Sequence, residues 1–261
     1  MSRVLVTGSS DGLGLMAARR LIAAGHEVVL HGRNQDRARD ALAAAPTAHG
    51  VVVGDLASMV ETRALADQAN GLGPFDAVIH NAGVGDRGGR IETVDGLEHI
   101  FAINVLAPYL LTALIERPGR LVYLSSGLHR GGDPDLTDLH WKRRRWNGFQ
   151  AYSDSKLFDV VLAFAIARRW PVVRSNAVDP GWVATKMGGR GAPDNFDLGS
   201  ETQAWLAVSE DSAAMVSGAY VYHKRRQDPH AAARDVAIQD GLLAACEELT
   251  HTPMPGGGRP S

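Results

Sequence analysis

The stretch "TGSSDGLG" (residues 7–14) decides the fold, because it joins a β-branched run, "RVLVT" (3–7), to an amphipathic helical segment, "LGLMAARRLIAAG" (13–25). Its three glycines allow a tight turn and let the backbone approach a ligand. The helix that follows would present unpaired N–H groups and its positive dipole end at this turn. The stretch therefore predicts a strand, a phosphate-binding turn and a helix, the arrangement that seats a dinucleotide pyrophosphate.

The alternation of strand and helix continues along the chain. Segments with helical spacing separate further β-branched runs, which lie at 27–32, 50–55, 75–80, 120–125, 172–178 and 218–222. Strands that read as continuous apolar runs are typical of a parallel sheet covered by helices on both faces. The sequence therefore predicts an α/β protein of three layers, with a doubly wound, mostly parallel sheet of seven strands.

The chain shows no internal repeat and no dividing linker. We therefore expect a single domain over residues 1–250, followed by a flexible tail over 251–261. Two polar, glycine-containing segments, 127–150 and 183–200, are long for plain loops. Both follow predicted strands, so both should lie at the carboxyl edge of the sheet, where open α/β sheets bind ligands. They are predicted to form flaps over a substrate site.

Composition excludes several classes of protein. The formal net charge of −2 argues against a general nucleic-acid-binding protein, although "WKRRRW" (141–146) is a basic run. Cys246 is the one cysteine, so no internal disulfide can form. The longest apolar stretch, 160–167, is far shorter than the about 20 residues of a membrane span, and the N-terminus lacks a signal-peptide pattern. The histidines are scattered, without metal-ligand spacing. We expect a cytoplasmic protein with no metal and with no membrane or nucleic-acid partner.

A second stretch, "AYSDSKLFDVV" (151–161), carries candidate chemistry. Tyr152 and Lys156 would share one face of a helix, with Cβ atoms about 5–6 Å apart. An ammonium beside a phenol favours the phenolate, so the tyrosine could act as a general acid or base near neutral pH. The alternative is a surface tyrosine and lysine on an ordinary helix. Their place after the predicted fifth strand and after "LVYLSSG" (121–127) favours the chemical role.

Together the motifs resemble those of the short-chain dehydrogenase/reductase family. They are TGxxxGxG, YxxxK, "HNAG" (80–83) and "DPGWVAT" (179–185), and they span nearly the whole chain in order. The resemblance implies a Rossmann fold, a nicotinamide cofactor, and hydride transfer between that cofactor and a carbonyl or secondary alcohol. A long gap of 26 positions separates Ser126 from Tyr152 (152 − 126), which resembles the branch of retinol dehydrogenases and protochlorophyllide reductases.

The resemblance also implies roles for individual residues. Tyr152 would move the proton, with Lys156 beside it. Ser126, in preference to Ser125, would hydrogen-bond the substrate oxygen. Asn104 would hold a water that links Lys156 to solvent. The residues expected to contact the cofactor are Gly8, Ser10, Gly12, Leu13, Gly14, Arg33, Asp55, Leu56, Asn81, Ala82, Gly83, Tyr152, Lys156, Pro180, Gly181, Val183 and Thr185.

The end of the second predicted strand bears on the choice of cofactor. An acidic residue there would accept from the ribose 2′-hydroxyl and repel a 2′-phosphate. Here Gly32 stands in that place and Arg33 follows, and a guanidinium can bind a phosphate bidentately. A solvated arginine in a loop is the alternative. The pattern favours NADP(H) over NAD(H), although Asp11, in the glycine stretch, points the other way.

The expected partner is a small-molecule carbonyl or alcohol substrate. The 127–150 flap would offer apolar surface from Trp141, Trp146 or Phe149. The segment 151–169 is apolar on more than one face, which predicts a subunit contact and a homodimer or homotetramer. A non-catalytic dinucleotide-binding sensor is the main alternative, but such proteins usually lose the tyrosine or the lysine. An epimerase or dehydratase is disfavoured by the glycine spacing.

Overall fold

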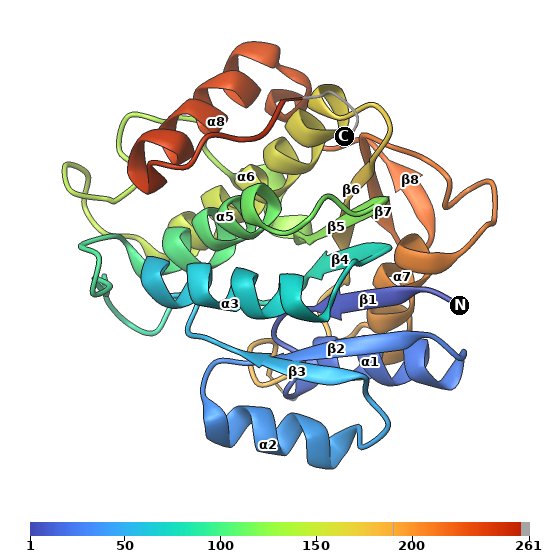
Figure 1. The fold of residues 1–261 in the computed structure, drawn as a ribbon. Coiled ribbons are helices and arrows are strands. Elements are labelled where there is room, and N and C mark those ends of the chain that lie inside the picture. The colour runs from blue at the N-terminus through green and yellow to red at the C-terminus, as the bar shows by residue number, and fades with distance from the viewer. Residues whose placement is uncertain (190, 257–261) are drawn as a thin grey trace.

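A sheet of eight strands forms the centre of the computed structural model, which describes residues 1–189 and 191–256 (Figure 1). The strand order is β3-β2-β1-β4-β5-β6-β7-β8, and only the last pairing, β7 with β8, is antiparallel. The order turns back between β1 and β4, so the topological switch point lies at the carboxyl ends of these two strands. The strands are β1 (Arg3–Val6), β2 (Glu27–Gly32), β3 (Gly50–Val53), β4 (Ala77–His80), β5 (Arg120–Leu124), β6 (Arg174–Asp179), β7 (Ala219–Tyr222) and β8 (Arg225–Gln227).

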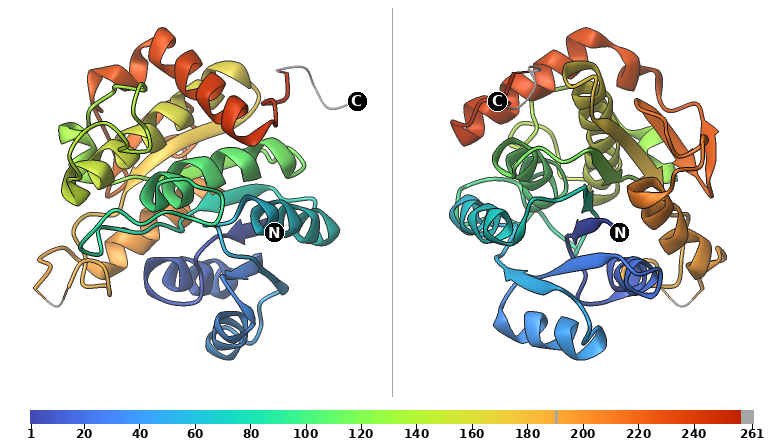
Figure 2. Two further views of the ribbon diagram at one scale, coloured as in Figure 1. Left: turned by 90° about the vertical axis from the view of Figure 1, so that its left-hand side faces the viewer. Right: turned by 45° about the vertical axis from the view of Figure 1, so that its right-hand side comes forward.

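Helices cover both faces of the sheet (Figures 1 and 2). One layer holds α1, α2 and α7, and the other holds α3, α5 and α6. The α-helices are α1 (Gly12–Ala23), α2 (Gln35–Ala44), α3 (Met59–Leu72), α4 (His99–Phe101), α5 (Ala107–Leu114), α6 (Gly148–Arg169), α7 (Phe196–Val208) and α8 (Val236–Thr250). The shorter helical turns are η1 (Ala102–Leu106), η2 (Gly127–Gly131) and η3 (Ala231–Arg234).

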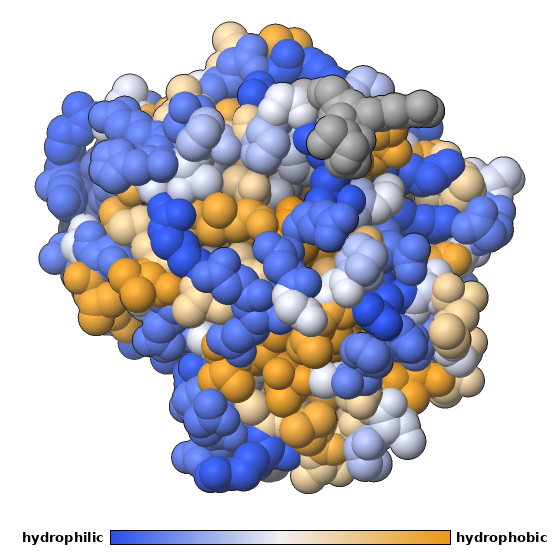
Figure 3. All heavy atoms as spheres, in the orientation of Figure 1, coloured by the Kyte–Doolittle hydropathy of each residue, from blue (hydrophilic) through white to orange (hydrophobic). Residues whose placement is uncertain are grey.

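Each buried strand divides its side chains between two cores. In β1, Leu5 packs among residues of α3, α5 and α6, whereas Val4 and Val6 pack on the layer of α1, α2 and α7. This follows from the two-residue period of a strand, which sends successive side chains to opposite faces. Helix α2 needs only one apolar face, and hydrophilic side chains gather over its first part at the lower left of Figure 3.

The fold class predicted from the sequence is confirmed: the protein is α/β, with a doubly wound, mostly parallel sheet between two helical layers. The seven predicted strands are β1 to β7, and the prediction missed β8. Strand β8 consists of two arginines and a glutamine, all exposed, so it carries no apolar pattern. The reverse turn that forms it uses His223 and Lys224 in the left-handed region, with φ of 46° and 62°.

Helix α6 is buried on almost every face by the chain itself. Its apolar residues meet the sheet on one side, while α8 lies along another side (Figure 1). Leu242, Leu243 and Cys246 of α8 belong to the same core as α6. The apolar faces of the 151–169 segment therefore need no second subunit to cover them. The burial of this segment no longer supports the prediction of a homodimer or homotetramer, which stays a prediction.

Residues 252–255, the first part of the predicted tail, pack against the body of the domain. Thr252 and Met254 are buried, and the indole of Trp170 donates to the carbonyl oxygen of Pro255 at 3.0 Å. The guanidinium of Arg63 donates to the hydroxyl of Thr252 at 2.8 Å. This segment packs beside α3 and α6 through a single apolar side chain, which leaves no periodic signal in the sequence. Residues 257–261 lie outside the described residues.

In the part of the chain that the structure describes, no helix combines the length and the apolar character needed to cross a membrane.

Replacing Met254 with alanine tests the packing of this terminal segment. We expect the free energy of unfolding to fall by about 2–5 kcal/mol, because the side chain is buried in the core and its removal leaves a cavity. Urea unfolding followed by circular dichroism measures the change. Val60→Ala is the control, since Val60 is 73% exposed on α3 and should change stability little. Equal stability of the two variants would show that residues 252–255 do not dock.

Candidate active site

The glycine turn between β1 and α1 packs against the end of β4. Gly8 has a φ of 63°, and a Cβ added there would lie 2.8 Å from the Cα of Ala82. A Cβ on Gly14 would lie 2.4 Å from Nδ2 of Asn81. The same amide group of Asn81 donates to the carbonyl oxygen of Thr7 at 3.0 Å. Only glycine fits at positions 8 and 14, because the turn and the end of β4 are in direct contact.

The N-terminus of α1 faces the carboxyl edge of the sheet without being capped by Asp11. The carboxylate of Asp11 instead accepts from Nη2 of Arg37 at 2.6 Å and from Nζ of Lys186 at 2.7 Å. Partial burial opposes ionisation, but the hydrogen bond from Lys186 and the charge of Arg37 hold the pKa of Asp11 below its usual value. The first N–H groups of α1 therefore remain suited to an anionic ligand such as a pyrophosphate.

His31 orders the glycine turn, and the sequence analysis missed it. Its Nδ1 accepts from the backbone N–H of Gly8 at 2.9 Å, and its Nε2 lies 2.9 Å from the carbonyl oxygen of Gly54. This pattern requires the neutral ring with its proton on Nε2, and burial lowers the pKa of His31, which favours that neutral form. The hydroxyl of Ser9 accepts from the backbone N–H of His31 at 2.8 Å. A histidine inside an otherwise apolar run was the available signal.

Asn104 sits in a turn of π-helix, η1, between α4 and α5. Its Oδ1 accepts from the backbone N–H of Val84 at 2.8 Å. Its Nδ2 donates to the carbonyl oxygen of Val84 at 3.0 Å and to the hydroxyl of Ser155 at 2.9 Å. The side chain thus ties the segment after β4 to α6, and π-turns of this kind often occur at functional sites.

Tyr152 and Lys156 lie on one face of α6, as their spacing predicts. Nζ of Lys156 is 5.7 Å from the centre of the Tyr152 ring. A Cβ on Gly83 would be 3.4 Å both from this Nζ and from Oδ1 of Asn104, so Gly83 lies against the two side chains. The residues after β4, the π-turn and α6 therefore meet at one place.

The two serines that follow β5 have different surroundings. The hydroxyl of Ser125 is buried and donates to the carbonyl oxygen of Lys156 at 2.7 Å. Ser126 is half-buried, and its hydroxyl accepts from the backbone N–H of Leu128 at 3.3 Å. The Ser125 hydroxyl is committed to holding α6 on β5, whereas the hydroxyl of Ser126 keeps its proton free to donate.

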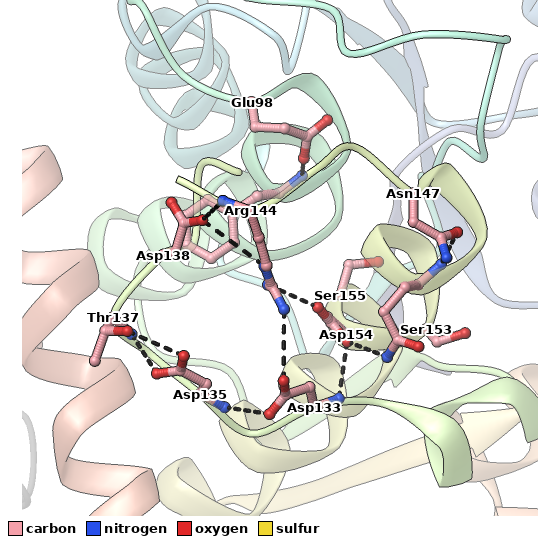
Figure 4. A network of polar contacts seen from close by, with 12 residues as sticks. Glu98, Asp133, Asp135, Thr137, Asp138, Arg144, Asn147, Ser153, Asp154 and Ser155 are labelled. Carbon is pink, nitrogen blue, oxygen red and sulfur yellow. Dashed lines mark hydrogen bonds and ion pairs between the residues drawn. The ribbon is translucent and has the colours of Figure 1, made fainter. Parts of the chain in front are cut away.

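The 127–147 part of the first predicted flap is anchored on α6 by Arg144 (Figure 4). Its guanidinium forms an ion pair with Asp154 at 3.0 Å and stacks on Trp141 at 3.8 Å from the ring centre. Trp141 is buried and meets Trp146 edge to face, while Phe149 at the start of α6 is 62% exposed. Of the three aromatic residues expected to offer apolar surface, only Phe149 is largely open.

The segment after β6 returns over the glycine turn and projects from the body of the molecule (Figure 2). The Cγ2 methyl of Thr185 is 3.9 Å from a Cβ placed on Gly12. Val183 is buried against Gly199. The carboxylate of Asp179 accepts from the backbone N–H of Gly181 at 2.8 Å and from the hydroxyl of Tyr220 at 2.9 Å, which fixes the turn at Pro180.

The remaining predicted cofactor contacts lie along the same edge of the sheet. Arg33 is exposed after β2 and, in the described part of the chain, its guanidinium has no carboxylate partner. Asp55 follows β3, but the side chain of Leu56 is buried in the core, so a contact from Leu56 would have to come from its backbone. Oδ1 of Asn81 is buried and unpaired among the described side chains. The positively polarised turn, the open edge and this unpaired oxygen fit a dinucleotide.

Among the described residues, no cluster of three or more His, Cys, Asp or Glu side chains could hold a metal ion. His80 is buried, stacks on Tyr123 at 4.8 Å and bonds Thr112 at 3.1 Å.

Comparison with known proteins identifies the family. The model of the short chain dehydrogenase family matches residues 2–134. An uncharacterised oxidoreductase of Emericella nidulans is 44% identical over 262 residues, which cover 98% of this chain and 100% of that protein. The protein belongs to the short-chain dehydrogenase/reductase family. It is therefore an NAD(P)-dependent enzyme that acts on CH–OH or C=O groups.

More distant relatives agree with this membership. Mouse polyprenol dehydrogenase is 31% identical over 97% of this chain and 84% of its own length. Human retinol dehydrogenase 13 is 29% identical over 97% and 85%, which confirms the resemblance to the retinol dehydrogenase branch. The crystal structure of an uncharacterised protein from Mycobacterium paratuberculosis superposes with a TM-score of 0.83 at 29% identity, covering 98% of this chain and 95% of that one. An NADP complex of a dehydrogenase from Burkholderia cenocepacia has the same fold, with a TM-score of 0.67 at 23% identity over 85% and 95%.

Replacing His31 with alanine should weaken dinucleotide binding by this enzyme. The Gly8 N–H and the Gly54 carbonyl would each lose a partner, at a cost of about 1–3 kcal/mol per buried group, and the glycine turn would loosen. We expect a lower melting temperature, and a higher Kd for NADPH when binding is measured by isothermal titration calorimetry. The exposed His49, replaced in the same way, is the control. A His31→Ala variant that binds NADPH like the His49→Ala variant would show that the turn does not depend on this ring.

Proposed function

We propose that the protein is an NADPH-preferring carbonyl reductase or alcohol dehydrogenase in which Tyr152 moves the proton. The observation that carries the proposal is the meeting of Tyr152, Lys156, Asn104 and Gly83 beside the dinucleotide edge of the sheet. When bound, the nicotinamide cofactor supplies or accepts the hydride.

The protein's own residues would hold the substrate and handle the proton. The Ser126 hydroxyl would donate to the substrate oxygen as negative charge develops there. The Tyr152 hydroxyl would give that oxygen its proton in reduction and remove it in oxidation. The Lys156 ammonium on the same helix face would stabilise the phenolate that reduction leaves behind. Asn104 would hold α6 and the segment after β4 in register through Ser155 and Val84.

The preference for NADPH rests on the end of β2. A Cβ on Gly32 would lie 2.5 Å from the backbone nitrogen of Ala38, so the packing of α2 leaves no room there for a carboxylate side chain. Arg33 follows as an exposed guanidinium that can bind a phosphate bidentately. Arg37 lies in the first turn of α2, with Asp11 as its partner. Two guanidinium groups without an acid at position 32 favour a 2′-phosphate.

The rim of the site suggests a substrate with an apolar body. Phe149, Trp182 and Met187 are all more than half exposed. Met187 contacts the loop after β4 at Gly85, and Asp86 of the same loop packs on Gly148 next to Phe149. Residues of both flaps therefore lie next to the loop after β4 and present apolar side chains to solvent. Two relatives are named for retinol and polyprenol, which are apolar alcohols.

Replacing Tyr152 with phenylalanine removes one hydroxyl and should abolish turnover. We expect kcat to fall by at least about 100-fold, because the positioned proton donor is lost. Absorbance of NADPH measures turnover on a panel of apolar aldehydes, ketones and alcohols, and calorimetry measures NADPH binding, which should stay nearly intact. Tyr222→Phe, a change at the end of strand β7, is the control and should keep full activity. Retained activity in Tyr152→Phe would remove the assigned proton donor.

Replacing Arg33 with alanine should separate the two cofactors. We expect the Kd for NADPH to rise about 10- to 100-fold, the loss of one charge-assisted contact, while the Kd for NADH changes little. Arg39→Ala is the matched control, because Arg39 is an exposed arginine of α2 that pairs with Asp36. Equal losses of NADPH and NADH affinity in Arg33→Ala would assign this arginine to packing and overturn the proposed preference.

A further inference from the structure

Lys156 shares its buried position with a second charge, Asp159, which the reaction does not explain. The two residues are 4% and 2% exposed. Nζ of Lys156 donates to Oδ2 of Asp159 at 2.8 Å and to the carbonyl oxygen of Leu124, at the end of β5, also at 2.8 Å. An ammonium has three donors, so one remains for the side of Tyr152 and the ligand.

A buried ammonium needs a counter-charge to stay ionised. Removing it from water favours the neutral amine and, in unpaired buried lysines, lowers the pKa by up to about 3–5 units. The carbonyl of Leu124 supplies only a dipole. Asp159 is the one carboxylate within ion-pair distance of Lys156 in the described part of the chain. Although burial works against it, the charge of Asp159 holds the pKa of Lys156 above its usual value.

We propose that Asp159 is a positioning residue, the counter-ion that keeps Lys156 protonated and holds its ammonium in place on the helix face that carries Tyr152. The proposal rests on the proposed role of Lys156 in proton transfer. Asp159 acts only through Lys156 and would touch neither substrate nor cofactor. Because it lies one helical turn beyond the lysine, it pulls the ammonium to a fixed point between α6 and β5.

Burial keeps Tyr123 and His80, two further titratable groups near the pair, neutral near physiological pH. Tyr123, on β5, is the further group whose charge would interact with Asp159, and burial raises the pKa of its phenol. His80 stacks on Tyr123, and burial lowers the pKa of this ring to about 3. Tyr152 faces the ammonium from α6. The pair is therefore an isolated ionic couple between two layers of the fold.

The Asp159 carboxylate should become protonated, and so lose its negative charge, only below neutral pH. Burial raises the pKa of Asp159 to about 6, although Lys156 beside it favours the carboxylate. Above that value both groups are charged, and the ammonium is held until strongly alkaline pH. Below it, Asp159 takes up a proton and the lysine loses its counter-ion.

The charge of Lys156 can be read directly by nuclear magnetic resonance. The chain has few lysines, and all but Lys156 are exposed; they are Lys142, Lys156, Lys186 and Lys224. The full-length protein is prepared with lysine labelled with ¹³C at Cε, and the signal that Lys156→Arg lacks is assigned to Lys156. We expect this signal to keep the chemical shift of the protonated amine up to about pH 10, because an ordinary lysine loses its proton only near pH ~10.4.

Asp159→Asn should lower the midpoint of the Lys156 titration by at least about 2 pH units, because burial is then unopposed. Asp159→Glu keeps the charge and should leave the midpoint near that of the natural protein. Asp154→Asn is the matched control, since it neutralises another buried carboxylate of α6 that pairs with Arg144. An unchanged midpoint in Asp159→Asn would overturn the proposal. Should that variant fail to fold, a Lys156 titration well below pH 10 in the natural protein would overturn it as well.

The pH profile of alcohol oxidation gives the second readout. In Asp159→Asn the rate should fall on the alkaline side, where Lys156 loses its proton, whereas a purely structural defect would lower the rate equally at every pH. The titration does not depend on turnover. If Asp159→Asn shifts the Lys156 midpoint but the natural protein oxidises no alcohol, the role of the ion pair stands and only the proposed function is refuted.

Discussion

The contact between the glycine turn and the end of β4 is the constraint on which the site depends. β1 and β4 are neighbours in the sheet, and both end at the same edge. Gly8 and Gly14 lie against Ala82 and Asn81, with no space for a Cβ. Gly83, the residue after Ala82, lies next to Lys156 and Asn104, where a Cβ would be in ordinary contact at 3.4 Å from each. A few residues at the end of β4 thus hold the glycine turn and the Tyr152–Lys156 face of α6 at a fixed separation.

The sequence predicted the elements that depend on burial on both faces and missed those that do not. β1 to β7 are apolar runs because each strand lies between helical layers. β8 is exposed and charged, and it exists because a reverse turn at His223 and Lys224 folds it onto β7. The docking of residues 252–255 depends on a single buried methionine and on hydrogen bonds from distant side chains. Neither feature leaves a periodic pattern.

Individual site residues were predictable where a motif fixed their neighbours. Tyr152 and Lys156 lie on one helix face because helical geometry alone places them there. His31 and Asp159 could not be found this way. His31 matters because Gly8 and Gly54 come from two other connections of the sheet. Asp159 pairs with Lys156 where both side chains are buried, and burial cannot be read from the spacing of residues in one helix.

Ion pairs with residues distant in the sequence change the effect that Asp11 is expected to have on the choice of cofactor. In the sequence it pointed away from NADP(H), because relatives that prefer NADP often carry a basic residue near this place. In the structure it is shared between Arg37 and Lys186, which lie 26 and 175 positions away along the chain. Its charge is offset by two cations, so the local field at the edge of β2 is set by the arginines. Asp11 also draws the segment after β6 towards the glycine turn.

The insert before α6 is anchored on a different face of that helix from the one that carries Tyr152. Arg144 binds Asp154, which lies two residues after Tyr152 and therefore on a different face of the same helical turn. Burial raises the pKa of Asp154 even though Arg144 opposes this, so the anchor is a desolvated ion pair whose geometry must be kept. The largely exposed Phe149 lies at the start of α6 and takes no part in this ion pair. Changing it alters the shape of the rim, while the helix that carries Tyr152 and Lys156 stays fixed by β5 and by Asn104.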